Sequence, residues 1–395
     1  MDLEFTPDQE ELRTTVRAFL AAECPVELVR RVVESRMRSG AHGDPAGTDP
    51  AGTDPALDLW RSMASLDWPA LNVPGDFGGM GLGMAEVAVV TEELGAVLAP
   101  GPFLATATQF VPVVVRAGNA DQGERLLGPV ASGHRTGALA VADHPARWVP
   151  DGIMATAERT SSGWVLGGVK HMVCVGPDDA ADLVVAARPS TSEGGVGLFV
   201  VAREHLVVRA ERVLDASRPL SSVVVDGVEV PDENVLGDPG APTVAAALRQ
   251  AMAEAALGFA VEVIGTCRTL FDMTVSYAKD RHQFGVPIGS FQAVKHKMTD
   301  LYVALERARS LVYYAVATVD EGDPGAPLAI AMAKAAADDC QRLVCREAIQ
   351  TFGGIGFTWE ADVHLYVKRA MTAGAMFGSA AEHRLVVARL LGVPA

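Results

Sequence analysis

The segment Tyr277–His296 carries side chains that could bind a phosphorylated cofactor with a flat ring. Arg281 could fork onto a pyrophosphate, because a guanidinium presents several N–H donors in one plane. Phe284 could lie against the ring, and Gln292 could both donate and accept hydrogen bonds. Glycines and prolines between these residues indicate a turn that closes one helix and opens the next. Taken alone, the segment could equally be a capped helix junction with surface charge.

A second segment, Gln350–Glu360, contains Gly353, Gly354 and Gly356. Glycine lets a backbone approach another group closely and adopt positive φ. By itself this segment could be a packing turn between two helices. Both segments lie in a stretch of helical pattern, so helices must position them.

Helical pattern fills both ends of the 395-residue chain. We expect a helical N-terminal domain over 1–128 that begins with an amphipathic helix from Thr6 to about Glu23. From Pro242 the pattern is helical again and predicts a C-terminal helical domain over 241–395. Between Gly40 and Pro55 the sequence is rich in Gly and Pro and repeats Ala-Gly-Thr-Asp-Pro, which predicts a loop or insertion.

The middle of the chain has a different sequence pattern from the two helical ends. Short β-branched runs bounded by Gly, Asp and Pro predict a small antiparallel β domain over 129–240. The runs are Gly163–Leu166, Leu183–Ala186, Leu198–Val201 and Ser222–Val225. The expected order is therefore helices, then a sheet, then helices.

The composition excludes several classes of protein. A formal net charge of −16 would repel a phosphate backbone, so we expect no nucleic-acid partner. No apolar stretch is long enough for a membrane span, and the acidic start does not resemble a targeting peptide, so the cytoplasm is the expected location. The five cysteines have neither CxxC pairs nor His partners at zinc spacing, which favours buried, reduced thiols and no structural metal.

Basic residues gather in one stretch of this acidic chain. The stretch from Lys279 to Lys297 could hold an anionic ligand such as coenzyme A. Elsewhere, Arg268, Lys368 and Arg369 are expected to be ordinary solvated charges unless a coenzyme A phosphate lies beside them.

At their separation in the helical C-terminal half, the two glycine-containing segments together resemble the signature segments of the acyl-CoA dehydrogenase family. The resemblance extends over nearly the whole chain. It includes Phe5–Gln9, Val73–Gly81, Glu92–Gly95, Trp164–Lys170, Ala181–Leu183 and Arg384–Arg389.

The resemblance implies a mainly α fold with a helical N-terminal domain, a β middle domain and a C-terminal four-helix bundle. It implies FAD as the cofactor, bound between the β domain and the bundle and held in part by a neighbouring subunit. A dimer or a dimer of dimers would then form. The substrate would be an acyl-CoA, and an electron-transfer flavoprotein would take up the electrons.

The resemblance also assigns cofactor contacts residue by residue. Arg281 resembles the family's pyrophosphate arginine, with Phe284 and Gln292 as further FAD contacts. Three other residues resemble the contacts made to a partner subunit's adenosine end: Gln350, Gly353 and Gly354.

One departure from the family concerns the middle domain. Many members carry a Thr/Ser-rich segment there whose backbone and hydroxyls meet the flavin. The corresponding stretch of this chain, Leu139–Trp148, has lost that pattern. Contacts to FAD from this side are therefore not expected on the family's pattern.

A second departure concerns the base. Family chemistry removes the α-proton of an acyl-CoA with a carboxylate, while the β-hydrogen leaves as hydride to the flavin. The commonest position of that glutamate falls on Phe377, which cannot take a proton. Other members carry the base on the helix before Arg281, and their position falls near Ala255.

Three carboxylates could replace the missing base. Glu262 lies on the same helical stripe as Ala255, and we prefer it as the catalytic residue. Glu254 flanks Ala255, and Glu382 follows the vacated position. Glu262 could instead be hydrogen-bonded to Thr266 or to a backbone group, and the chain could lack a base altogether.

Three functions stay open. The leading one is FAD-dependent α,β-dehydrogenation of an acyl-CoA thioester to a 2-enoyl-CoA. The alternative is a non-catalytic scaffold that pairs with a catalytic homologue and contributes half of each flavin site, as in mixed assemblies that degrade sterol side chains. A third is a biosynthetic relative acting on a carrier-bound acyl thioester.

Overall fold

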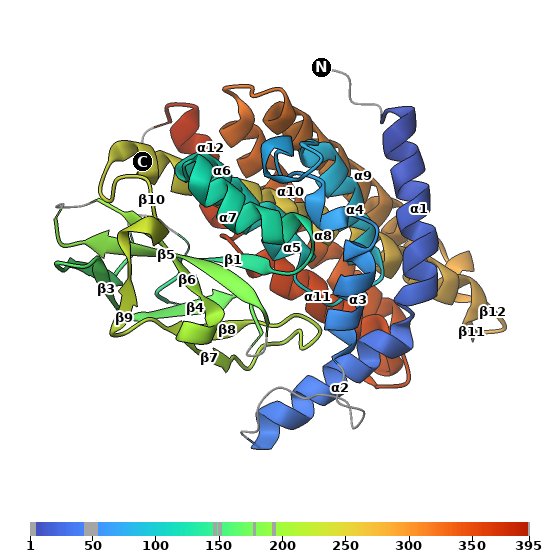
Figure 1. Cartoon of the computed structure of the whole chain (residues 1–395). Coiled ribbons are helices and arrows are strands. Elements are labelled where there is room, and N and C mark those ends of the chain that lie inside the picture. The colour runs from blue at the N-terminus through green and yellow to red at the C-terminus, as the bar shows by residue number, and fades with distance from the viewer. Residues whose placement is uncertain are drawn as a thin grey trace. The chain divides into compact units, whose positions relative to one another are not determined.

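The computed structural model describes residues 5–42, 54–144, 148, 152–176, 179–191 and 195–393 (Figure 1). The chain divides into two compact units. The first combines the residues up to Val26 with Ala88–Ala99 and the residues from Ala256 onward; the second combines Glu27–Val87 with Pro100–Ala255. The order of elements is helices, strands, then helices, as the sequence predicts. The three domain boundaries drawn from the sequence stay a prediction.

Helix α1 (Pro7–Glu23) opens the first unit at the predicted place. The hydroxyl of Thr6 accepts a hydrogen bond from the N–H of Gln9, and the side chain of Gln9 accepts one from the N–H of Thr6. This reciprocal cap satisfies two amide groups that a helix start leaves unpaired. Val16 and Leu20 form its buried face.

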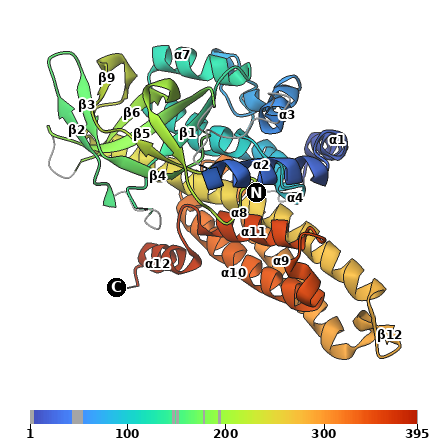
Figure 2. The same ribbon diagram turned by 90° about the horizontal axis from the view of Figure 1, so that it is seen from below.

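A helical bundle makes up most of the first unit. Its elements are the part of α8 (Pro242–Asp280) from Ala256 onward, α9 (Gln292–Asp320), α10 (Ala326–Phe352), α11 (Val363–Ala375) and α12 (Ala380–Leu390). Helix α10 packs against α9, α11 and α12. Figure 2 shows α9 and α10 running side by side, with the α8–α9 connection at one end of the bundle.

Two glycines set the contact between α8 and helix α4 (Met84–Ala96) in the first unit. A Cβ added to Gly95 would lie 2.4 Å from the backbone oxygen of Glu262, and one added to Gly265 would lie 1.9 Å from the backbone oxygen of Glu92. No side chain fits at such distances, so the two backbones touch only because both positions are glycine.

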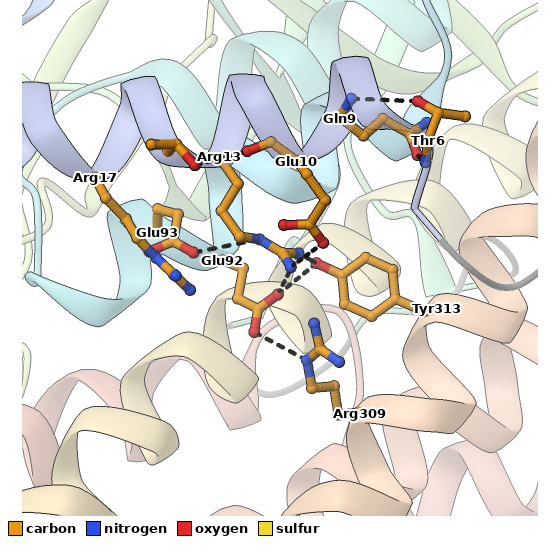
Figure 3. Close-up of polar contacts among 10 residues, drawn as sticks. Thr6, Gln9, Glu10, Arg13, Arg17, Glu92, Glu93, Arg309 and Tyr313 are labelled. Carbon is orange, nitrogen blue, oxygen red and sulfur yellow. Dashed lines mark hydrogen bonds and ion pairs between the residues drawn. The ribbon is translucent and has the colours of Figure 1, made fainter.

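Charged side chains join α1, α4 and α9 in the interior of the first unit (Figure 3). Arg13 Nη2 lies 3.4 Å from Glu92 Oε2, and Arg13 Nε lies 3.5 Å from Glu93 Oε1. The hydroxyl of Tyr313 donates to Glu92, and Arg309 Nε lies 3.3 Å from the other oxygen of Glu92. Burial beside Glu92 raises the pKa of Tyr313 well above its usual value, so this hydroxyl stays protonated as a donor.

Several helices precede the sheets in the second unit. They comprise α2 (Val26–His42), α3 (Pro55–Ala64), η1 (Trp68–Ala70), η2 (Gly75–Phe77), α5 (Phe103–Ala105), the π-helical turn η3 (Thr106–Phe110), α6 (Val111–Ala117) and α7 (Ala120–Ala131). Helix α2 continues to His42, so the first residues of the segment predicted as a loop, Gly40–Pro55, are helical. Residues 43–53 lie outside the described part of the chain.

Two sheets occupy the rest of the second unit. A seven-stranded sheet has the order β10-β6-β5-β2-β3-β9 with β1 also paired to β5, and a three-stranded sheet has the order β4-β8-β7. The strands are β1 (Thr136–Ala140), β2 (Thr156–Arg159), β3 (Trp164–Gly167), β4 (Val169–Val173), β5 (Ala181–Pro189), β6 (Gly197–Ala202), β7 (Val207–Ala210), β8 (Ser221–Val224), β9 (Val228–Val230) and β10 (Val235–Leu236).

Most strand pairs are antiparallel, as expected, but β1 and β2 both run parallel to β5. The length of β5 lets both strands pair with it. Its first half pairs with β1, from Thr136 opposite Ala181 onward, and its end pairs with β2, where Thr156 lies opposite Arg188. Two short strands thus lie along one edge of a nine-residue strand, while β6 takes the other edge.

Helix α8 is the one helix in the described residues that is long and apolar enough to cross a membrane. Its most apolar window is 72% buried inside the protein, which is typical of a core helix. Composition alone does not distinguish a membrane-spanning helix from a buried core helix.

Replacing Arg13 with Met should lower the free energy of unfolding by about 3–5 kcal/mol, because Glu92 and Glu93 would lose a buried partner. Arg17→Met is the matched control. Arg17 also pairs with Glu93, at 2.9 Å, but its side chain is 63% exposed against 7% for Arg13. The control should cost less than about 1 kcal/mol. Urea unfolding of both variants measures the difference, and equal losses would contradict this account of the network.

Candidate functional site

The connection between α8 and α9 is a strained hairpin. Strands β11 (His282–Gln283) and β12 (Val286–Pro287) pair antiparallel, and the two residues between them have positive φ: +53° for Phe284 and +80° for Gly285. Such a turn normally takes Asn, Asp or Gly first. A phenylalanine there costs about 1–2 kcal/mol.

Packing of the Phe284 ring within the described residues offsets little of this strain. It is 93% exposed, with an edge contact to Phe291 at 6.2 Å between ring centroids. Strain that is not offset by burial is a mark of a functional position. Arg281 and Gln292, on either side of the hairpin, are exposed as well.

The second segment ends α10 with an open glycine turn. Gly353 has φ +64°, which favours glycine, and it begins the 3-10 helix η8 (Gly353–Phe357). A Cβ added to Gly353 or to Gly354 would meet no atom within 4 Å. Nothing in the described part of the chain therefore requires glycine at 354, and close approach by a ligand or another chain is a physical reason for it. Gln350 is exposed one turn earlier.

An aromatic stack brings the two segments together. The ring of Tyr277 lies 4.2 Å from that of Phe352, with an angle of 18° between their planes. Tyr277 precedes Arg281 by about one turn, and Phe352 lies between Gln350 and Gly353. An exposed guanidinium, an exposed ring and a bare backbone thus share one end of the bundle, where Figure 2 places β12. These groups fit the diphosphate and ring of a dinucleotide.

Glu262 is buried in an ion pair. It is 3% exposed, and its Oε1 lies 2.8 Å from Nη1 of Arg369, which is itself 2% exposed. Arg369 also donates to the carbonyl of Leu98 at 3.2 Å and to that of Ala99 at 3.4 Å. The expectation that Arg369 is a solvated charge is wrong. Its guanidinium is buried, and its acceptors are the carboxylate of Glu262 in α8 and two backbone carbonyls just after α4.

The hydroxyl of Thr266 does not bond the carboxylate of Glu262. It donates to the backbone oxygens of Glu262 and Gly95, both at 3.0 Å. The sequence left open that Glu262 is hydrogen-bonded to Thr266 or to a backbone group. In the structure its carboxylate is instead paired with Arg369.

The other two candidate carboxylates also have partners. Glu254 is buried in the second unit, where its Oε1 lies 2.5 Å from Nη2 of Arg116. Glu382 caps α12 by accepting from the N–H and the hydroxyl of Ser379, both at 2.8 Å. Phe377, at the vacated base position, is buried.

A buried ion pair holds part of the segment Leu139–Trp148, which lacks the family's Thr/Ser-rich pattern. Lys170 Nζ lies 2.8 Å from Asp143 and donates to the carbonyl of Val141 at 3.0 Å, while Asp143 accepts from the N–H groups of Met154 and Ala155. Burial lowers the pKa of Lys170 to about 8, against the opposing effect of Asp143. The described part, Leu139–His144, offers no hydroxyl to a flavin; residues 145–147 lie outside the described part of the chain.

The described residues contain no candidate metal-binding cluster. No group of three or more His, Cys, Asp or Glu side chains there is placed to hold a metal ion. All five cysteines are buried, as the sequence predicts.

Sequence reasoning missed Arg369 and Arg116 as partners of the candidate carboxylates. Arg369 is 107 residues from Glu262, and Arg116 is 138 residues from Glu254. The one signal for Arg369 was its place between apolar residues in a helical pattern. Arg116 follows a run of valines, which was an equally weak signal.

Replacing Glu262 with Leu should lower the free energy of unfolding by about 3–5 kcal/mol, since the buried guanidinium of Arg369 would lose this carboxylate partner. The double variant with Arg369→Met should recover part of that loss. As a matched control, Glu306→Leu removes an ion pair of similar length, 2.7 Å, whose side chains are 37% exposed, and should cost less than about 1 kcal/mol. A double-mutant cycle by urea unfolding with no coupling between residues 262 and 369 would contradict a structural role.

Comparison with known proteins gives the family. Residues 6–134 match the acyl-CoA dehydrogenase N-terminal domain, and residues 245–392 match the acyl-CoA dehydrogenase C-terminal domain. Acyl-CoA dehydrogenase IpdE2 of Mycolicibacterium smegmatis is 32% identical over 94% of this chain and 94% of its own length.

Solved structures share the fold over the whole chain. Butyryl-CoA dehydrogenase from Megasphaera elsdenii has a TM-score of 0.85 with 24% identity, covering 99% of this chain and 100% of its own. A chain of the ChsE4–ChsE5 complex from Mycobacterium tuberculosis also has a TM-score of 0.85 with 24% identity, covering 100% of each chain. The chain belongs to the acyl-CoA dehydrogenase family of FAD-dependent oxidoreductases.

Proposed function

We propose that this chain is one subunit of a mixed acyl-CoA dehydrogenase that converts an acyl-CoA thioester to a 2-enoyl-CoA. Its part is to hold the nucleotide half of FAD, while a homologous subunit supplies the carboxylate that removes the α-proton. When bound, FAD accepts the β-hydrogen as hydride. An electron-transfer flavoprotein is the acceptor we propose for the electrons.

The observation that carries this proposal is the ion pair between Glu262 and Arg369. A general base must bind a proton during the reaction. If Glu262 did so, the buried charge of Arg369 would lose its counter-ion at that moment. Glu254 is also paired with an arginine, Arg116, and Glu382 is committed to a helix cap.

The cofactor-binding role rests on the exposed end of the bundle. In this proposal the exposed guanidinium of Arg281 forks onto the diphosphate, and the exposed ring of Phe284 offers an apolar face to a flat ring. Gln350, Gly353 and Gly354 present an amide side chain and bare backbone for the adenosine end. Gln292 begins α9 beside the hairpin and adds a donor and an acceptor.

The fold is compatible with a mixed assembly. ChsE4 and ChsE5 are two proteins in one complex, and a chain of that complex has the same fold as this one. IpdE2 is named an acyl-CoA dehydrogenase, which supports the reaction class. The competing hypothesis is a self-sufficient dehydrogenase with Glu262 as its base.

The Arg281→Ala variant should lose FAD from the assembly. The chain is expressed with the homologue that co-purifies with it, and bound FAD is measured by visible absorption and by fluorescence titration. We expect at least a tenfold weaker affinity for FAD, because a charge-assisted fork to a phosphate contributes about 1.5–3 kcal/mol.

The matched control for that experiment is Arg268→Gln, which removes an arginine charge from α8, the helix that ends just before Arg281. Arg268 pairs with Glu306 and lies about four turns from the hairpin. The control should keep its FAD. Unchanged FAD affinity in Arg281→Ala would refute the proposed role of the hairpin.

A further inference from the structure

The connection between α11 and α12 holds an aromatic residue in a backbone conformation that favours glycine. Phe377 has φ +55°, and Gly378 after it has φ +105°. Positive φ brings the Cβ of an L-residue against its own backbone, which glycine avoids. Phe377 is nevertheless buried, with 5% of its surface exposed. The strained backbone therefore serves to place the ring inside the protein.

The ring of Phe377 packs against a second aromatic ring. Its centroid lies 5.8 Å from that of Phe259 in α8, with 29° between the ring planes. Phe259 is fully buried and precedes Glu262 by about one helical turn. The two rings thus fill the space between α8 and the α11–α12 connection.

Hydrogen bonds fix this connection on both sides of the ring. Nε2 of His383 lies 3.0 Å from the carbonyl of Phe377, and burial lowers the pKa of His383 to about 4, so the neutral imidazole donates this N–H. Before the ring, Lys334 Nζ donates to the carbonyl of Gly374 at 2.7 Å and pairs with Asp338 at 2.6 Å. These contacts hold the backbone on both sides of the ring.

We propose that the Phe377–Phe259 pair is a plug that keeps the acyl chain of a thioester out of this chain's own substrate position. The inference rests on the proposed function, in which a homologous subunit carries the base. At that position a carboxylate would have to contact the α-carbon of the substrate, and here two stacked rings occupy the space. A subunit without a base thereby avoids holding a substrate that it cannot convert.

The test compares octanoyl-CoA with free coenzyme A as probes, using isothermal titration of the full chain. Each accommodated methylene strengthens binding by about fourfold, so even partial entry of the octanoyl tail is measurable. Phe377→Gly keeps the left-handed backbone and removes the ring. Phe377→Asn is a second variant that also tolerates this backbone, for use if glycine loosens the fold. Phe110→Leu, in the core of the second unit, is a control for altered aromatic packing.

We expect the wild type to bind octanoyl-CoA no more than about twofold more tightly than coenzyme A. At least one folded Phe377 variant should bind octanoyl-CoA at least tenfold more tightly than the wild type does, with coenzyme A affinity unchanged. A wild type that binds octanoyl-CoA more than tenfold more tightly than coenzyme A would overturn the proposal. So would folded variants that leave octanoyl-CoA binding unchanged.

This outcome is separable from that of the proposed function. FAD retention in the mixed assembly reports on Arg281 and should be the same with Phe377 or Gly at position 377. Loss of the Arg281 effect would remove the proposed cofactor role, whereas an octanoyl-CoA result depends only on the space that the ring occupies.

Discussion

The ion pair between Glu262 and Arg369 constrains both the structure and the chemistry of the first unit. Two charges at 2.8 Å are almost completely removed from water, which is tolerable because they are paired with each other. Arg369 also binds the carbonyls at the end of α4, so three segments distant in sequence meet at one guanidinium. The close passage of α4 over α8 at Gly95 and Gly265 brings these carbonyls into reach. A carboxylate used in this way is poorly suited to accept a proton from a substrate.

Other buried charges in the chain are also committed to structure. Lys170 with Asp143, Glu254 with Arg116, and Lys334 with Asp338 are ion pairs inside their respective units. The exposed groups of the bundle end differ in kind. There the chain keeps a strained phenylalanine and glycines with open space around them, which no contact within the chain explains. The physical contrast supports a subunit that binds part of a cofactor and leaves proton transfer to another subunit.

The sequence predicts much of the fold because its signals are local. The Thr6-x-x-Gln9 cap, the β-branched runs of the middle and the Gly/Pro turn after Asp280 each act over a few residues. The parallel pairing of β1 and β2 with β5 escaped prediction, because it depends on strand length and on distant connections. The partner of Glu262 escaped for a related reason, since a helix period indicates which face is buried but not which charge faces it. The positive φ of Phe377 and Phe284 gives no signal in residue type.

Whether this chain has a working base can be measured on the chain alone. The purified protein would be saturated with FAD, mixed anaerobically with a panel of acyl-CoAs, and followed through the visible absorption of the flavin. We expect no reduction by any acyl-CoA until the homologous subunit is added. Reduction by the chain alone that disappears in a folded Glu262→Gln variant would contradict the account and establish Glu262 as the base.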